Sequence, residues 1–215
     1  MRVAIMQPTW LPWIGYFDLI DQVDRFVFLD PVQYCPRSWH SRNRIKTASG
    51  ETWISLPVSG SRRAGTTVRT AIANPEHQMR KAVETIRHAY KDATGFEEEA
   101  PGLFELLREM RDGTGLAEVN IRFIRYAMQR LAIDTETLKS SDLPAFEGRV
   151  ERLIDICKHL GADTYVSAPG SAAYLKEDDL KRFENAGLSL AFHRYDHPFY
   201  RQCGKGFTGY LSVVD

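Results

Sequence analysis

The chain has 215 residues, and its 28 Lys and Arg balance its 28 Asp and Glu, so its formal net charge at pH 7 is zero. This balance argues against a general nucleic-acid binder, and we expect no DNA partner, because such proteins usually carry a basic excess. With 43% hydrophobic and 11% aromatic residues, the chain has ample apolar surface for the core of one domain. No apolar run approaches the roughly 20 residues of a membrane span, so we expect no membrane partner.

The three cysteines, Cys35, Cys157 and Cys203, are scattered and form no CxxC pair. The first strand-like run follows Met1 at once, without the apolar core of a secretory signal. We therefore expect a cytoplasmic protein with free thiols.

The first 30 residues predict a strand, a loop, a helix and a second strand. Apolar residues 3–6 and 26–29 form short runs bounded by polar residues or proline, which is typical of strands buried on both faces. A helix-like stretch covers residues 17–23. A right-handed βαβ unit places its first loop at the carboxyl edge of a parallel sheet, where ligands bind. The aromatic loop from Trp10 to Tyr16 is therefore the first candidate for a ligand site.

Residues 31–58 lack the pattern of a βαβ unit and predict a loop followed by a hairpin. Residues 31–41 form a polar, aromatic and basic loop, and the runs on either side of Ser49-Gly50 predict a hairpin at about 40–58. Residues 60–65 are expected to form a mobile basic loop, and the β-branched residues 66–73 another strand.

A helical segment at about 74–131 follows, and its first helix begins with Asn74-Pro75 as N-cap and N1 residues. An α/β rhythm then returns. Strands are predicted at 135–139, 164–167 and 188–192, and helices at 147–160 and 177–186. The expected fold class is α/β, a three-layer domain spanning 1–215 with a mainly parallel Rossmann-like sheet, a β-hairpin insert and a helical segment.

A basic segment follows the second strand. If residues 42–46 form a strand, Arg42, Arg44 and Lys46 share one face, because side chains alternate. Three cations on one face repel one another unless an anion lies among them, which favours recognition of phosphate or carboxylate. The alternative is a solvated face with salt bridges to neighbouring carboxylates.

Further candidates follow other strands. His197 stands among aromatic residues just after the last strand, where it could act as a general acid or base or pack as a hydrogen-bonded residue. Ser140 and Ser167 also follow strands, and they could bind phosphate oxygens or cap helices. Cys35 lies near Arg37 and His40, but no spacing positions it as a nucleophile.

Together these signals predict one site at the carboxyl ends of the strands. The predicted catalytic residues are His197 and Asp30. The residues predicted to bind substrate are Gln7, Trp10, Trp13, Tyr16, Gln33, Arg37, Trp39, Arg42, Asn43, Arg44, Ser140, Ser167, Tyr200 and Gln202. The histidines show neither HxH nor HExxH spacing, no GxGxxG follows the first strand, and no GxxxxGK[ST] occurs, so we expect no metal and no resident cofactor.

These residues resemble the WbqC-like family of bacteria over nearly the whole chain. The resemblance rests on QPTWLPWIGYF at 7–17, VQY at 32–34, RSW at 37–39, RNRI at 42–45 and WISLPV at 53–58. Later matches are SS at 140–141, GADTYVS at 161–167, the residues His197, Pro198, Tyr200 and Gln202, and LSVVD at 211–215.

The family is named for its occurrence in O-antigen and surface-polysaccharide gene clusters. The resemblance implies an enzyme that decorates sugars or small metabolites by acyl or aminoacyl transfer. Cys35 does not belong to the shared pattern, which argues against a thiol mechanism.

A second resemblance is to pantothenate synthetase and its nucleotidylyl-transferase relatives. Pro8-Thr9, Gly15 and residues 31–34 fall at matching places. Trp13 and Tyr16 stand where those enzymes carry the two histidines of their HxGH motif, which argues against nucleotidylyl transfer.

We therefore expect a group-transfer enzyme that acts on an anionic activated donor and on an amine or hydroxyl of a sugar or small metabolite. The expected partners are a small-molecule substrate with phosphate or carboxylate, and as donor a small molecule, a carrier protein or a charged tRNA. Two alternatives remain open. One is an ATP-dependent nucleotidylyl transferase or ligase, and the other is a non-catalytic module that binds a sugar nucleotide or a carrier protein.

Overall fold

The computed structural model describes residues 1–59, 66–67, 70–110, 115–170 and 175–215. These residues form two compact units. The first unit comprises residues 1–7, 15–31 and 128–196, and the second comprises residues 8–14, 32–127 and 197–215. Within the described ranges, no helix combines the length and the apolar character needed to cross a membrane. The expectation of a single domain stays a prediction.

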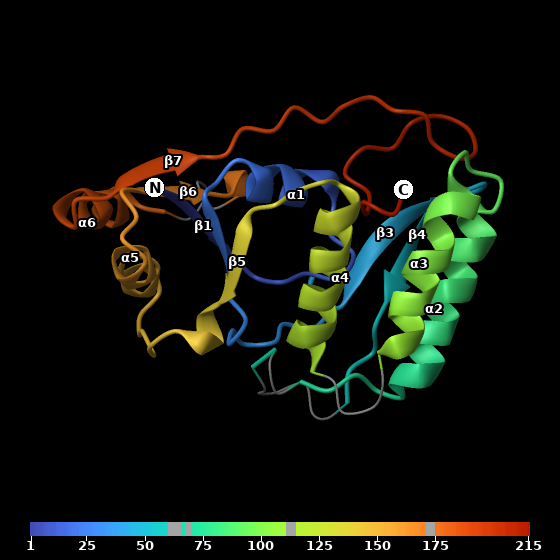
Figure 1. Cartoon of the computed structure of the whole chain (residues 1–215), viewed down its shortest axis with the longest axis horizontal. Helices are drawn as coiled ribbons and strands as arrows, with labels where there is room; N and C mark the ends of the chain where they lie inside the picture. The colour runs from blue at the N-terminus through green and yellow to red at the C-terminus, as the bar shows by residue number, and fades with distance from the viewer. Residues whose placement is uncertain (60–65, 68–69, 111–114, 171–174) are drawn as a thin grey trace. The chain divides into compact units, whose positions relative to one another are not determined.

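A five-stranded parallel sheet forms the centre of the first unit (Figure 1). Its strands are β1 (Arg2–Met6), β2 (Arg25–Phe28), β5 (Glu136–Lys139), β6 (Thr164–Ser167) and β7 (Ser189–Phe192). They lie in the order β5-β2-β1-β6-β7, and every neighbouring pair is parallel. The strand order reverses at β1, which places a topological switch point between the carboxyl ends of β1 and β6. The predicted Rossmann-like sheet is confirmed.

Helices cover both faces of this sheet, because its central strands are apolar on both sides. On one face, α1 (Ile14–Asp21) brings Tyr16 edge-on to Phe26 of β2, with ring centres 5.5 Å apart. On the other face, α5 (Val150–His159) and α6 (Glu177–Asn185) share one apolar cluster with Val3 of β1. The three-layer arrangement is confirmed.

Two helices of the first unit begin at different residues than predicted. The helix expected at 17–23 begins at Ile14 instead, and this extension brings Tyr16 into the core. The helix expected from 147 begins only at Val150. Gly148 precedes it with a φ of 78°, a left-handed conformation that an α-helix cannot contain, and this explains the late start.

The second unit contains a hairpin and three helices. Strands β3 (Arg42–Thr47) and β4 (Gly50–Ser55) pair antiparallel, and α2 (Pro75–Tyr90) lies along them (Figure 1). Helix α3 (Phe96–Glu109) packs against α2, and α4 (Leu116–Arg130) belongs to this unit up to residue 127. Asn74 caps α2 by accepting a hydrogen bond from the His77 backbone N–H at 3.4 Å. The predicted hairpin insert and helical segment are confirmed.

The described residues of the segment predicted as a strand, 66–67 and 70–73, do not form one. Thr66, Ala71 and Ile72 make only isolated bridges, and residues 68–69 lie outside the described part of the chain. The backbone N–H and the hydroxyl of Thr70 both donate to Thr66 O, at 3.0 and 2.9 Å. Such hydrogen bonds from a threonine to a nearby carbonyl compete with strand pairing. The basic loop predicted at 60–65 also lies outside the described residues.

The three free cysteines differ in environment, and we expect them to differ in reactivity. Cys157 is fully buried, and this burial raises its pKa to about 12, whereas Cys35 is exposed. Burial also raises the pKa of Cys203, which is partly exposed. Because the thiolate is the reacting form, Ellman's reagent should modify Cys35 first in the native protein and Cys157 only after unfolding. Cys35→Ser should remove the fast phase, and rapid native modification of Cys157 would contradict this packing.

Candidate functional site

The carboxyl ends of the five parallel strands carry a row of polar residues. In sheet order these are Ser140, Asp30, Gln7, Ser167 and His193. Backbone hydrogen bonds continue the pairing past the strand ends, from Leu29 N to Met6 O and from His193 N to Ser167 O, both at 2.9 Å. The four of these residues that the sequence predicted as site residues therefore lie on one edge of one sheet.

Asp30, which follows β2, forms hydrogen bonds to the residues that follow β5. Its side chain is 2% exposed, and its carboxylate accepts hydrogen bonds from the hydroxyl of Ser140 at 3.0 Å and from the backbone N–H and hydroxyl of Ser141 at 2.9 and 2.5 Å. These bonds hold the 3-10 turn Ser140–Asp142 against the end of β2. Three donors already engage the carboxylate, so the geometry supports a positioning role. The role of Asp30 as a base stays a prediction.

Sequence reasoning missed His193. Its buried Nε2 lies 2.5 Å from a carboxylate oxygen of Asp18 in α1, and the same oxygen accepts a hydrogen bond from Gln22 at 2.6 Å. The Tyr195 ring stacks on the imidazole, with centres 6.2 Å apart. The pair ties the end of β7 to α1. The one available signal was position, because His193 directly follows the last strand, as Gln7 follows the first.

In the second unit, Asn43 holds the aromatic loop that follows β1. Its amide donates to Trp10 O at 3.2 Å and to Leu11 O at 2.7 Å, and its oxygen accepts from the Arg44 backbone N–H at 2.8 Å. Leu11 has a φ of 44°, a left-handed conformation that costs a non-glycine residue roughly 1–2 kcal/mol. Both amide hydrogens of the buried Asn43 are used, so its side chain is suited to positioning this loop. Its predicted contact with substrate stays a prediction.

Asn120 of α4 holds the same loop from its beginning. Its side chain is fully buried, and its amide donates to Pro8 O at 3.1 Å and to His40 O at 2.8 Å. Sequence analysis did not single out this residue. An asparagine on a helix face that is otherwise apolar was the signal available.

Two aromatic residues predicted to bind substrate lie in the core. Trp10 is fully buried, with its ring centre 6.3 Å from that of Phe123. Tyr16 is 1% exposed, its hydroxyl donates to Gln7 O at 3.1 Å, and burial raises its pKa. This burial supports a structural role for both, and their contact with a ligand stays a prediction.

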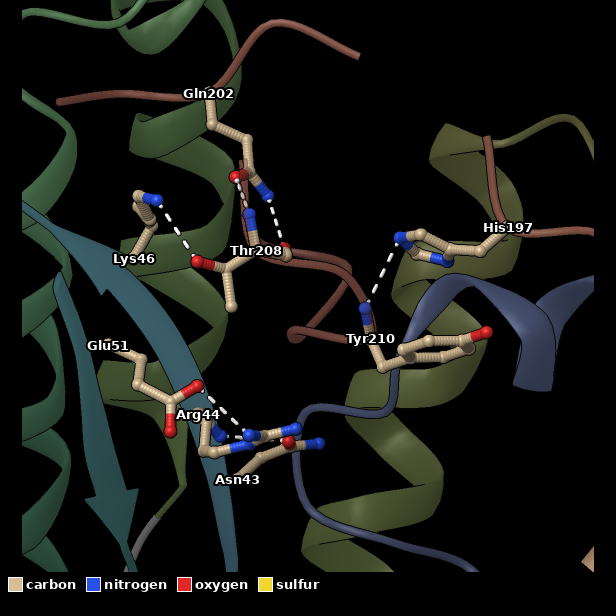
Figure 2. A network of polar contacts seen from close by, with 8 residues as sticks. All are labelled: Asn43, Arg44, Lys46, Glu51, His197, Gln202, Thr208 and Tyr210. Atoms are coloured by element: carbon tan, nitrogen blue, oxygen red, sulfur yellow. Dashed lines mark hydrogen bonds and ion pairs between the residues drawn. The ribbon is translucent and has the colours of Figure 1, made fainter. Parts of the chain in front are cut away.

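The three cations of β3 share a face, as predicted, but each has a different neighbour. Arg44 forms an ion pair with Glu51 at 2.9 Å (Figure 2). Lys46 is 3% exposed and donates from Nζ to Gly206 O and to the Thr208 hydroxyl, both at 3.1 Å. Arg42 pairs with no carboxylate among the described residues. Because Arg44 and Lys46 already have partners within the chain, no shared anion is needed to offset repulsion among the three cations.

Arg42 lies instead on an exposed aromatic surface. Its guanidinium carbon is 4.3 Å from the centre of the Trp53 ring, within the range of a cation–π contact. Trp39 lies beside Trp53, with ring centres 5.7 Å apart and planes tilted by 33°. The two tryptophans are 49% and 46% exposed. We refer to Trp39, Trp53 and Arg42 as the tryptophan–arginine surface. Arg37 and Gln33, which precede it in the chain, are also exposed.

In the C-terminal segment, the side chain of Gln202 forms hydrogen bonds to the backbone of Thr208. Its amide nitrogen donates to Thr208 O at 2.8 Å, and its oxygen accepts from the Thr208 backbone N–H at 2.8 Å (Figure 2). The same nitrogen and the Tyr200 hydroxyl donate to the Asp215 carboxylate at 2.5 and 2.8 Å. These bonds fold residues 202–208 into a closed loop. The predicted substrate contacts of Tyr200 and Gln202 stay predictions.

His197 lies in an aromatic cluster of the second unit. Its ring stacks on Tyr210 with centres 4.6 Å apart, and the Trp13 ring centre is 6.4 Å away. Its Nε2 accepts a hydrogen bond from the Tyr210 backbone N–H at 3.2 Å (Figure 2). Burial lowers the pKa of His197, and the Asp215 carboxylate opposes this effect only in part. The hydrogen bond occupies a lone pair that a general base would use, so catalysis by His197 stays a prediction.

We expect the unfolding free energy to fall as pH decreases below about 6.5. Burial lowers the pKa of both His197 and His40 in the folded chain, so the unfolded chain binds more protons in this range. Their stabilising contribution is present above about pH 6.5 and is lost as pH falls through the folded pKa values. Urea unfolding between pH 7.5 and 5 measures this slope. His197→Gln should make it shallower, whereas exchange of the exposed His88 should not.

The described residues also bear on metal binding. Among them, no three His, Cys, Asp or Glu side chains gather as metal ligands would. The expectation of no metal and no resident cofactor stays a prediction.

The strand order and the polar carboxyl edge define an α/β protein with a Rossmann-like parallel sheet. The chain belongs to the WbqC-like protein family, whose model matches residues 7–215, and the predicted membership is confirmed. It is similar to the uncharacterized protein Rv1507c of Mycobacterium tuberculosis, with 33% identity over 215 residues that cover 100% of this chain and 91% of that protein. No solved structure matches the chain.

Proposed function

We propose that this protein is a cytoplasmic group-transfer enzyme of the acyl or aminoacyl type, in the biosynthesis of a bacterial surface polysaccharide or specialised metabolite. Its donor is an anionic activated compound, and its acceptor is an amine or hydroxyl on a sugar or small molecule. The proposal is supported by the resemblance of the shared motifs to a family named for polysaccharide gene clusters.

The observation that carries the proposal is the polar carboxyl edge of the parallel sheet. Open sheets of this type bind ligands outside the carboxyl ends of their strands, at the switch point. Here Gln7 directly follows β1 and Ser167 is the last residue of β6, and these two strands flank the switch point. Gln7 is exposed at this edge of the sheet.

With a thioester donor, the acceptor nitrogen attacks the carbonyl carbon of the donor, a C–N bond forms, and the C–S bond breaks. The proton lost by the amine passes to a base, and the leaving thiolate takes up a proton. His197 and Asp30 are the predicted bases, and proton transfer of this kind contributes typically ~10²–10⁴-fold to the rate.

The test is a transfer assay followed by mass spectrometry. Purified protein is incubated with acyl-CoA thioesters, sugar nucleotides, carrier-protein thioesters or charged tRNA, each with amine and hydroxyl acceptors. We expect one donor to yield a product heavier by the transferred group. Gln7→Ala should lower kcat/KM by about tenfold or more without lowering Tm, as loss of a positioning contact does. Gln129→Ala, an exposed glutamine on α4, is the matched control. Unchanged turnover in Gln7→Ala would contradict the proposed edge.

A non-catalytic binding module is the second candidate, and one observation favours it. The Asp30 carboxylate and the His197 Nε2, the two predicted bases, are already engaged by hydrogen bonds within the chain. Tight binding of a sugar nucleotide or carrier protein without turnover, unchanged by His197→Ala, would support this candidate.

A further inference from the structure

We infer that the tryptophan–arginine surface is a nucleotide-binding site, with the base on the tryptophan rings and the phosphate beside Arg42. The inference deepens the donor side of the proposed function. It rests on that function only for the role of the nucleotide as the carrier of the transferred group.

Both tryptophans of this surface are exposed. In β4, Trp53 pairs with Arg44, and the neighbouring Ile54 is 4% exposed. Because side chains alternate along a strand, Trp53 faces away from the side that buries Ile54. A single exposed aromatic residue needs no explanation, but two adjacent tryptophans that are nearly half exposed form a contiguous apolar surface, which is typical of a binding site.

The two arginines near the Trp53 ring differ in whether a carboxylate offsets their charge. Arg44 is 6.0 Å from the Trp53 ring centre, but its ion pair with Glu51 neutralises it. Arg42 is closer to the ring and has no carboxylate partner among the described residues. A guanidinium that is already stacked loses little freedom when it binds phosphate, which it can contact through two N–H groups. The surface therefore presents one cation fixed beside two aromatic rings.

Backbone hydrogen bonds hold the tryptophan–arginine surface in place. Hairpin pairing from Arg42 to Ser55 fixes the strands that carry Arg42 and Trp53. The Trp10 backbone N–H donates to Trp39 O at 2.9 Å, which ties Trp39 to the loop that Asn43 holds. A surface fixed in this way binds without first becoming ordered.

Together these features favour a nucleotide over simpler ligands. Every nucleobase has an aromatic face that stacks on tryptophan, and the attached phosphate supplies an anion for the Arg42 guanidinium. A neutral sugar would offer the guanidinium no opposite charge, and free phosphate would leave the rings in water. Both sugar nucleotides and coenzyme A thioesters carry a nucleotide.

The test is a titration of the full chain with AMP, CMP, GMP and UMP, followed by tryptophan fluorescence and calorimetry. At least one should bind with quenching of fluorescence, and more weakly as salt rises. Arg42→Gln and Trp53→Leu should each weaken it by about tenfold or more, and Trp53→Tyr should restore much of the affinity because it keeps a ring. The matched controls are Arg87→Gln, which removes another arginine 4.8 Å from an aromatic ring centre, and Phe199→Leu, which shortens an 83% exposed aromatic residue.

The inference is overturned if none of the four nucleotides binds at millimolar concentrations, or if Arg42→Gln and Trp53→Leu both bind as the wild type does. It is also overturned if inorganic phosphate or a free nucleoside binds as tightly as its nucleotide. Variant Tm values separate lost binding from lost folding. Nucleotide binding without transfer would leave the inference standing and contradict only the proposed enzyme activity.

Discussion

Asn120→Leu should lower the free energy of unfolding by roughly 2–6 kcal/mol, because it removes the hydrogen bonds to two buried carbonyl oxygens, at about 1–3 kcal/mol each. The two acceptors are Pro8 O and His40 O, which Asn120 reaches at 3.1 and 2.8 Å. Leucine nearly preserves the shape of the side chain, so cavity formation contributes little. Urea unfolding followed by circular dichroism measures the loss.

The matched control for this change is Asn185→Leu. Asn185 is exposed at the end of α6, and substitutions at such sites usually alter stability by less than about 0.5 kcal/mol. If Asn120→Leu proved as mild as its control, Asn120 would not hold the aromatic loop. A fall in stability together with weaker nucleotide binding would link the loop to the tryptophan–arginine surface.

Asp30→Ala is expected to have the second large effect, a loss of roughly 2–4 kcal/mol. The change removes three hydrogen bonds to a buried carboxylate and leaves the donors of Ser140 and Ser141 unpaired. Equilibrium unfolding with the same denaturant measures it.

Asp142→Ala tests the same turn without the buried contacts. The Asp142 side chain is 63% exposed and its ion pair with Lys139 spans 3.7 Å, so its loss should cost less than about 1 kcal/mol. Equal effects at the two positions would show that Asp30 does not position the turn. If Asp30→Ala kept wild-type stability but lost turnover, a role as a base would be favoured instead.

The sheet could be predicted because local signals agree with it. Short apolar runs that precede Gln7 and Asp30 mark the first two strands, and several of the predicted helices show regular apolar spacing. The segment at 66–73 was misread because threonine favours both strands and hydrogen-bonded turns, and only its surroundings decide between them.

The candidate site was less predictable, because its contacts join residues far apart in the sequence. The alternation that groups Arg42, Arg44 and Lys46 is local, but their neighbours come from β4 and from the C-terminal segment. Nothing in the sequence indicated that the Trp53 ring packs against the Arg42 guanidinium. Strand spacing places a residue on a face and does not reveal what lies opposite that face.

We propose that the chain binds an anionic, nucleotide-bearing donor through Arg42. A thermal-shift comparison of wild type and Arg42→Gln against sugar nucleotides and acyl-CoA thioesters tests it most directly. A ligand present at ~100 times its Kd stabilises the folded state by about 2.7 kcal/mol, enough to raise Tm measurably. We predict that at least one donor raises the Tm of the wild type and that Arg42→Gln abolishes the shift. A panel that leaves the wild type unchanged, or an equal shift in the variant, would contradict the account.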